Sequence, residues 1–125
     1  PFHSSLMRPA AEAFRKVLEL AVISDIAIPV IANCNAKPET TAKIIRENLV
    51  LQLFNSVYWV QSIEYLVAQG VTCFVECGSG KVLTGIIKRI APSARVVSVE
   101  KPEDMVVLEA VGIKVGGKKE MKKCH

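Results

Sequence analysis

The chain has 125 residues, which is enough for one domain of ordinary size but not for two. Half of the residues are hydrophobic and 22% are charged, a composition that excludes a disordered segment, and charged residues interrupt every apolar stretch before it reaches the ~20 residues of a membrane span. The net charge of +4 is concentrated in lysines near the C-terminus, so the body is nearly neutral and lacks the basic surface that nucleic-acid binding needs.

The first predicted element is an amphipathic helix from Ser5 to about Ala21. Apolar residues recur there at steps of three and four, as they do along one face of a helix. Ser4 or Ser5 is expected to cap the N-terminus of this helix. Residues 28–32 then form a short continuous apolar run, which predicts a strand buried on both faces, and Asn33 begins the following loop.

Two further helices are predicted in the middle of the chain. The Pro-Glu-Thr-Thr sequence at 38–41 is expected to open the first of them, which stops near residues 55–56. The second runs from Val57 to about Gln69. Gly70 is well placed to end it, because glycine accepts the left-handed conformation common at helix C-termini.

A strand, a helix and another strand follow. Residues 71–77 form an apolar run, and a Gly-Ser-Gly turn leads into a helix over residues 81–90. Pro92 prevents this helix from continuing, and the next strand covers residues 95–99. Strands separated by helices predict a parallel sheet with helices on its faces and right-handed crossovers. The predicted fold class is therefore α/β.

The cysteines predict neither a disulfide framework nor a metal site. Cys34, Cys73 and Cys77 lie in apolar, strand-like runs, where reduced cysteine packs as a small hydrophobic residue. A second metal-ligand pair at matching spacing is missing, so a zinc site is not expected. These features predict a cytoplasmic location. Pro1 opens the chain without a methionine or a signal-peptide pattern, and we expect that upstream sequence has been lost.

Two segments carry residue types used in catalysis. His3 lies immediately before a predicted helix, but a histidine considered alone is more often structural than catalytic. Ser79 lacks both flanking glycines of a G-x-S-x-G elbow, so it is not expected to be a nucleophile. The same segment fails as a phosphate-binding loop, because Val75 replaces the first required glycine and Val82 follows the lysine.

The first eleven residues, Pro-Phe-His-Ser-Ser-Leu-Met-Arg-Pro-Ala-Ala, closely resemble the F-H-S-x-L-M-x-P-A segment of bacterial malonyl-CoA:acyl carrier protein transacylases. Similar stretches continue within residues 28–37 and 53–65. Residues 76–89 resemble the family's E-x-G-x-G-K-V-L-x-G-L-I-K-R segment. The resemblance thus covers about the first hundred residues.

This resemblance implies a specific place within a larger fold. The family has an α/β-hydrolase-like acyltransferase domain with a small ferredoxin-like insertion. The chain would be the C-terminal part of the large subdomain, with parallel strands flanked by helices. Residues 1–100 would be the C-terminal portion of the transferase domain, and residues 101–125 a terminal helix with a lysine-rich tail.

The resemblance also implies a reaction. In this family, which serves fatty acid biosynthesis, a serine takes a malonyl group from malonyl-CoA and passes it to the phosphopantetheine thiol of acyl carrier protein, in a ping-pong sequence. His3 matches the histidine that accepts the serine proton and later protonates the thiol leaving group. The backbone carbonyl that orients this histidine falls on Gln52, and Phe2 matches a phenylalanine that narrows the acyl pocket. Gln52 also has a plain alternative, in which its carbonyl bonds only within its helix.

The family's other properties complete the expectation. They imply a malonyltransferase with malonyl-CoA and acyl carrier protein as partners, no bound cofactor or metal, no nucleic acid or membrane partner, and a monomer when complete. The serine, the oxyanion-hole glutamine and the malonate-binding arginine lie upstream in this family, so the chain alone is not expected to be active. Lys88 and Arg89 end a helix. Their positive charges are better explained by a favourable interaction with the helix dipole than by binding of the carrier protein.

Two alternatives stay open. The acyltransferase domain of a polyketide or multifunctional fatty acid synthase shares the fold and the Phe-His pair, although the early finish after Val99 favours a free-standing enzyme. A noncatalytic, truncated remnant is the alternative of a different class. The family commonly has proline at the position of Ser79 and valine at that of Cys77, so the turn there is expected to be less rigid.

Overall fold

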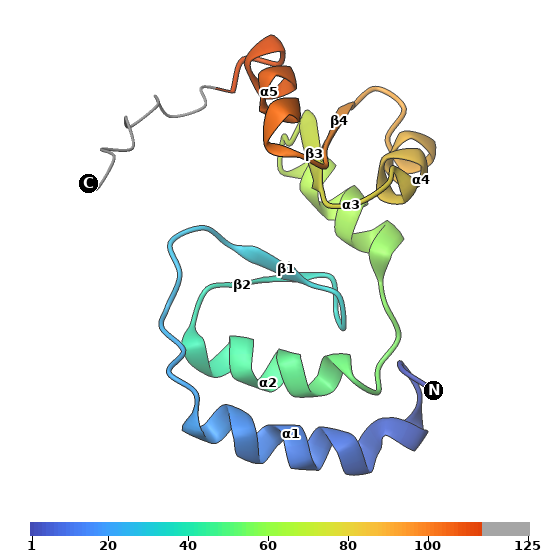
Figure 1. Ribbon diagram of the computed structural model, residues 1–125. Helices are drawn as coiled ribbons and strands as arrows, with labels where there is room; N and C mark the ends of the chain where they lie inside the picture. The colour runs from blue at the N-terminus through green and yellow to red at the C-terminus, as the bar shows by residue number, and fades with distance from the viewer. Residues whose placement is uncertain (114–125) are drawn as a thin grey trace, which may run out of the picture. The chain divides into compact units, whose positions relative to one another are not determined.

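The computed structural model describes residues 1–113, and the chain folds as two compact units, Pro1–Gln69 and a second that begins at Gly70 (Figure 1). The first unit contains, in order, a 3-10 turn at Ser5–Met7, α1 (Arg8–Leu20), β1 (Val30–Ala32), β2 (Lys37–Glu39), α2 (Ala42–Gln52) and α3 (Trp59–Ala68). The second contains β3 (Cys73–Cys77), α4 (Val82–Ile90), β4 (Arg95–Val99), a 3-10 turn at Pro102–Met105 and α5 (Val106–Ala110). None of the helices within residues 1–113 has the length and apolar character needed to cross a bilayer.

Helices α1 and α2 lie side by side, in opposite directions, and form the core of the first unit (Figure 1). Val50 of α2 is 1% exposed and packs with Ala11 and Leu18 of α1. Partly buried apolar side chains surround this centre: Phe14, Ile23, Leu53 and Phe54. The predicted first helix is confirmed, but without a serine cap, because the hydroxyl of Ser4 donates to the carbonyl of Pro1 at 2.7 Å.

The predicted strand at residues 28–32 is one arm of an antiparallel hairpin. β1 pairs with β2, and Val30 lies opposite Glu39. The amide of Ala36 donates to the carbonyl of Ala32 at 2.8 Å, and Ala36 takes a left-handed φ of 56° to close the turn. The prediction of a strand buried on both faces is wrong, because Val30 is 50% exposed. A four-residue turn returns the chain antiparallel, whereas a parallel neighbour needs a crossover of about a dozen residues.

Helix α2 begins later than its sequence suggested. The prediction that residues 38–41 open the helix is wrong, because residues 37–39 form β2. The first turn of α2 is instead capped by Thr41, whose hydroxyl accepts from the amide of Ile44 at 3.5 Å. The carboxylate of Asp25 accepts from the amide of Ala42 at 2.8 Å. These bonds satisfy amides at the start of the helix that have no partner within it.

A buried polar chain joins the hairpin to α2. The side-chain amide of Asn48 donates to the carboxylate of Glu39 at 2.5 Å. The side-chain amide of Asn35 donates to the side-chain oxygen Oδ1 of Asn48 at 3.3 Å. Asn48 and Glu39 are 8% and 7% exposed, so the buried carboxylate of Glu39 depends on Asn48, which Asn35 holds in turn, for a hydrogen-bonding partner.

The second unit confirms the predicted parallel arrangement. β3 and β4 pair in parallel, with Cys73 opposite Arg95 and Cys77 opposite Val99, and α4 connects them. Gly78 and Gly80 take φ values of 138° and 83° in the turn after β3, which glycine adopts without the strain a side chain would add. The α/β fold class is therefore correct.

Glu76 of β3 fastens the strand to the N-terminus of α4. Its carboxylate accepts from the hydroxyl and amide of Thr84 at 2.6 and 2.7 Å, and from the amide of Leu83 at 3.0 Å. The bond from the Thr84 hydroxyl, together with the two amide bonds, holds the pKa of Glu76 below its usual value. Glu76 of the preceding strand thus caps the N-terminus of α4.

The end of the chain is described only in part. The 3-10 turn at Pro102–Met105 and helix α5 occupy the place of the predicted terminal helix. The predicted lysine-rich tail, residues 116–123, lies outside the described residues. The proposed boundary after residue 100 stays a prediction.

Candidate functional site

The backbone of His3 is held against the end of α2. Its amide donates to the carbonyl of Leu53 at 3.0 Å. His3 has a φ of 63°, a left-handed conformation that is uncommon outside glycine. Such a conformation costs about 1–3 kcal/mol and persists where surrounding contacts impose it. The contact with Leu53 fixes the position from which the imidazole reaches α2.

The imidazole of His3 meets two backbone carbonyls, one on the last residue of α2 and one three residues beyond it. Its Nδ1 atom lies 3.0 Å from the carbonyl oxygen of Gln52 and 3.1 Å from that of Asn55. The final carbonyls of a helix have no partner within it, and so are free to accept here. Because a carbonyl oxygen only accepts, Nδ1 must carry the proton that both oxygens share.

The other ring nitrogen of His3 is left as an acceptor. With Nδ1 protonated, the neutral ring carries a lone pair on Nε2. Within residues 1–113, no protein group hydrogen-bonds to Nε2, and no hydroxyl or thiol bonds to the ring. The site therefore contains an oriented base without a nucleophile beside it among those residues.

Phe2 lies beside the imidazole, and Phe54 lies in the turn that supplies the carbonyls. The ring of Phe2 lies 6.4 Å from the imidazole, centre to centre, with 52° between the ring planes, and Phe2 is 65% exposed. The guanidinium carbon of Arg8 sits over the ring of Phe54, 4.7 Å from its centre. This cation–π contact joins the start of α1 to the turn that supplies the carbonyls.

Sequence reasoning identified three members of this cluster, His3, Gln52 and Phe2, and missed the others. The structure brings together His3 and Gln52, as the resemblance suggested, and leaves Phe2 beside them. It adds the carbonyls of Leu53 and Asn55. Backbone carbonyls carry no side-chain signature. The one available signal was position, since Leu53 directly follows the end of α2 and Asn55 lies three residues beyond it.

Ser79 has a different environment in the second unit. Its hydroxyl donates to the carboxylate of Glu100 at 3.1 Å, and no histidine bonds to it within the described part of the chain. A serine that donates to a carboxylate with no imidazole beside it has the geometry of a structural residue.

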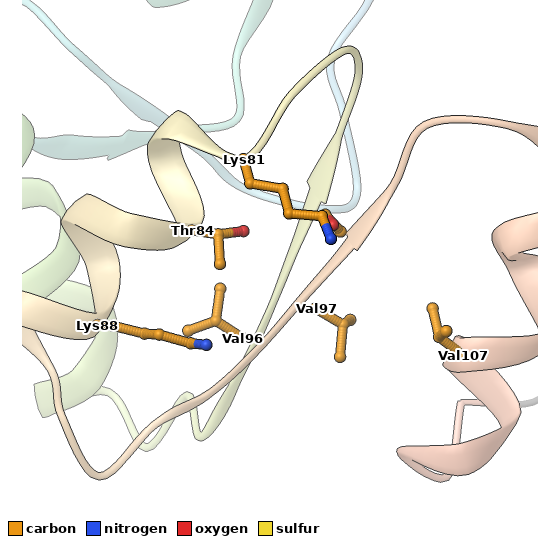
Figure 2. Close-up of a pocket in the computed structure, with 7 residues that line it drawn as sticks. Lys81, Thr84, Lys88, Val96, Val97 and Val107 are labelled. Carbon is orange, nitrogen blue, oxygen red and sulfur yellow. The ribbon is translucent and has the colours of Figure 1, made fainter.

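A pocket of about 280 Å³ also lies in the second unit (Figure 2). Side chains from α4, β4 and α5 line it: Lys81, Thr84, Lys88, Val96, Val97, Ser98 and Val107. This lining has amines and hydroxyls but no imidazole, thiol or carboxylate. In residues 1–113, no group of three or more His, Cys, Asp or Glu side chains is placed to hold a metal ion.

Comparison with known proteins gives a consistent result. No family model matches the chain. It is 44% identical over 103 residues to the malonyl CoA-acyl carrier protein transacylase of Bacillus subtilis strain 168, which covers 82% of this chain and 32% of the relative. The acyl-carrier-protein S-malonyltransferase of Bartonella henselae superposes with a TM-score of 0.84 and 38% identity, over 90% of this chain and 36% of that one. A malonyl-transacylase solved in complex with its type II PKS acyl-carrier protein gives a TM-score of 0.81 and 37% identity, over 86% and 35%. The chain spans about a third of the length of these proteins.

Proposed function

We propose that this chain, which belongs to the malonyl CoA-acyl carrier protein transacylase family as a segment of about a third of its relatives' length, supplies the proton-transfer histidine of malonyl transfer. The observation that carries the proposal is the pair of carbonyls on Nδ1 of His3. They favour the tautomer in which Nε2 is a free base. The two neutral carbonyls thus orient the imidazole, as a carboxylate does in many catalytic triads.

The proposed chemistry needs only proton movements at Nε2 of His3. A serine from the part of the transacylase outside this chain would give its proton to Nε2 as its oxygen attacks the malonyl thioester of malonyl-CoA. Nε2 would return that proton to the departing coenzyme A thiolate. In the second half, Nε2 would take the proton of the carrier protein's phosphopantetheine thiol and give it back to the serine oxygen. Neither half requires a bound cofactor or metal.

The carbonyl pair supports both halves of the cycle. When Nε2 is protonated, the ring becomes a cation, and its Nδ1–H group still faces two carbonyl oxygens at the negative end of α2. The imidazolium therefore keeps its orientation without a carboxylate. Phe2, exposed beside the ring, is proposed to form one wall of the acyl pocket and to disfavour substituents larger than malonyl.

The carrier protein is proposed as the second substrate, and its pathway stays open. The transacylase solved with its type II PKS acyl-carrier protein has 37% identity to this chain, so a polyketide carrier is a specific alternative to one of fatty acid synthesis. Competition between purified carrier proteins of the two classes, in a single transfer assay, would distinguish them by their relative kcat/KM.

A chimeric enzyme tests the proposal. This chain would replace the matched region of the Bacillus subtilis transacylase, and transfer of labelled malonyl to carrier protein would be measured. His3→Ala is expected to lower kcat by about 10²–10⁴-fold, the usual contribution of general acid–base catalysis. Gln52→Ala is the matched control, because it keeps the backbone carbonyl and should keep most of the activity. The proposal fails if a folded chimera is inactive or if His3→Ala transfers malonyl at the unsubstituted rate.

A further inference from the structure

The pocket of about 280 Å³ in the second unit follows the outer edge of β4. Its lining includes Val96, Val97 and Ser98, three consecutive residues of this strand. Successive side chains of a strand point to opposite faces, so a pocket touches all three only where it reaches the edge of the strand. Within residues 1–113, no strand pairs with β4 on this side. The pocket therefore meets a strand edge whose backbone groups are available to a ligand.

This edge supplies hydrogen-bond donors to the pocket. The amide of Arg95 donates to the carbonyl of Thr72 at 2.8 Å, which places the odd-numbered residues of β4 against β3. Alternate residues of a parallel strand direct their backbone groups to opposite sides. The amides of Val96 and Ser98 therefore point outward, to the side on which the pocket lies. Ser98 adds a hydroxyl, which is a further donor.

Two lysines bring positive charge to the same pocket. Figure 2 shows the side chains of Lys81 and Lys88 extending from the α4 side toward β4. Neither forms an ion pair in the described part of the chain, where the single salt bridge joins Arg15 to Glu12. The lining of the pocket contains no carboxylate. Its charged groups are thus two ammonium groups without a counter-ion among residues 1–113.

Acidic side chains line an adjoining pocket, which also includes Lys81. The carboxylate of Glu100 accepts there from the hydroxyl of Ser79 at 3.1 Å. The carboxylate of Asp104 accepts from the amides of Glu100 and Lys101 at 3.0 and 2.9 Å. Both carboxylates thus have hydrogen-bond donors of their own, and neither forms a salt bridge with a lysine of residues 1–113. The ammonium groups of the first pocket are left to a ligand.

The chemistry of the lining defines the ligand. Two ammonium groups, a hydroxyl and the outward amides are all donors, which suits an anion. A phosphate group carries a charge of about −1.5 to −2 and three acceptor oxygens, so it uses more of these donors than a carboxylate does. Three valines, Val96 and Val97 of β4 and Val107 of α5, form the apolar part of the lining. The volume is at the lower end of the ~300–1,000 Å³ of small-molecule sites, which limits the ligand to a small molecule.

We propose that this pocket binds a small phosphate monoester with a short apolar body, whose phosphate contacts the amines of Lys81 and Lys88 and whose apolar body packs on the valines. The sequence here does not form a phosphate-binding loop, so the contacts come instead from side chains on the α4 side and from the edge of β4. The pocket belongs to the second unit and His3 to the first. The inference therefore goes beyond the proposed function, because binding does not require the chemistry of His3.

The experiment uses the full chain and butyl phosphate as the probe, because butyl phosphate joins a phosphate to a short alkyl chain. Calorimetry measures its Kd, and NMR of the nitrogen-15-labelled chain locates the site. Inorganic phosphate lacks the apolar body, and butyrate replaces the phosphate by a carboxylate. Lys88→Gln and Lys81→Gln each remove one amine from the pocket. Arg89→Gln is the matched control, because it removes the same charge from the next position of α4, outside the lining. Thermal unfolding of each variant chain establishes that it is folded.

Butyl phosphate is expected to bind at one site with a Kd of about 1 mM or lower, and inorganic phosphate and butyrate at least about tenfold more weakly. The amide signals of Val96 and Ser98 should shift most. Lys88→Gln and Lys81→Gln should each raise the Kd at least about tenfold, and Arg89→Gln by less than about threefold. The proposal is overturned by the absence of binding, by equal Kd values for the three ligands, by equal effects of the lysine and arginine variants, or by shifts away from β4. A chain that binds the probe while its chimera transfers no malonyl contradicts the proposed function alone.

Discussion

The tautomer of His3 can be measured on the chain alone and tests the basis of its proposed role. Two carbonyl oxygens lie 3.0 and 3.1 Å from Nδ1. A net hydrogen bond is worth about 1 kcal/mol, and the opposite tautomer would also set a lone pair against both oxygens. With 1.4 kcal/mol equal to a factor of ten, the Nδ1-protonated form should predominate by about five- to tenfold.

Phe54→Ala is the perturbation that should reduce this preference. Phe54 lies in sequence between Gln52 and Asn55, whose carbonyls accept from His3, and it packs on the core and stacks under Arg8. Its removal loses a cation–π contact worth about 0.5–1 kcal/mol and about 2 kcal/mol of packing from a partly buried ring. The turn that ends α2 then loosens, and the tautomer ratio of His3 should fall towards one.

Long-range proton–nitrogen NMR on nitrogen-15 histidine, at a pH where the ring is neutral, reports the tautomer directly. His125 is the other histidine of the chain, so a His125→Gln sample assigns the His3 signals. Val22→Ala, at a side chain that is 98% exposed, is the matched control and should leave the ratio unchanged. A wild-type spectrum with the proton on Nε2 would refute the reasoning, because Nε2 would then be a donor and not a base.

Three stability measurements follow from the described contacts. Asn48→Ala removes the hydrogen-bonding partner of buried Glu39, and should lower the free energy of unfolding of the first unit by about 2–4 kcal/mol, measured by urea unfolding. If Glu39→Leu and Asn48→Leu are combined, the double variant should lose less stability than the sum of the two single variants. A loss equal to that sum would contradict the coupling of the two side chains. In the folded chain the pKa of Glu76 lies below its unfolded value of about 4.3. The ionised carboxylate therefore stabilises the fold above that pH, and the stabilisation is lost as pH falls through the lower pKa of the folded state. The Tm of the wild type should accordingly drop more steeply below pH 4 than that of Glu76→Gln. Thr41→Ala should cost about 1 kcal/mol as the loss of a helix cap, and Thr41→Ser should restore most of it.

The second unit was predictable because its signals are local. The Gly-Ser-Gly turn, the apolar runs beside it and the α4 sequence each favour one structure, and they agree with one another. The long helical connection between β3 and β4 then favours their parallel pairing, because a crossover of this length joins parallel neighbours. The first helix was equally clear from its periodicity, although its start was not, because a 3-10 turn at Ser5–Met7 precedes α1.

The hairpin was not predictable from the same rules. Its strands have three residues each, and Pro38 followed by Glu39 and two threonines is also a common opening for a helix. What decides the outcome is non-local: the carboxylate of Glu39 is buried against Asn48, nine residues further along the chain. A sequence pattern records neither that partner nor the left-handed turn at Ala36 that makes it reachable.

The site illustrates a related limit. A side chain in a motif can be matched by resemblance, and so His3 and Phe2 were found; the Gln52 carbonyl was placed only by its position along the same match. The groups that orient His3 are carbonyls of Gln52, Leu53 and Asn55, which any residue type supplies. Their usefulness comes from the place where α2 ends and from the left-handed backbone of His3. The orientation of the base is thus encoded by helix length and turn geometry, and substitutions that shift the end of α2 should disturb it more than those that change the Gln52 side chain.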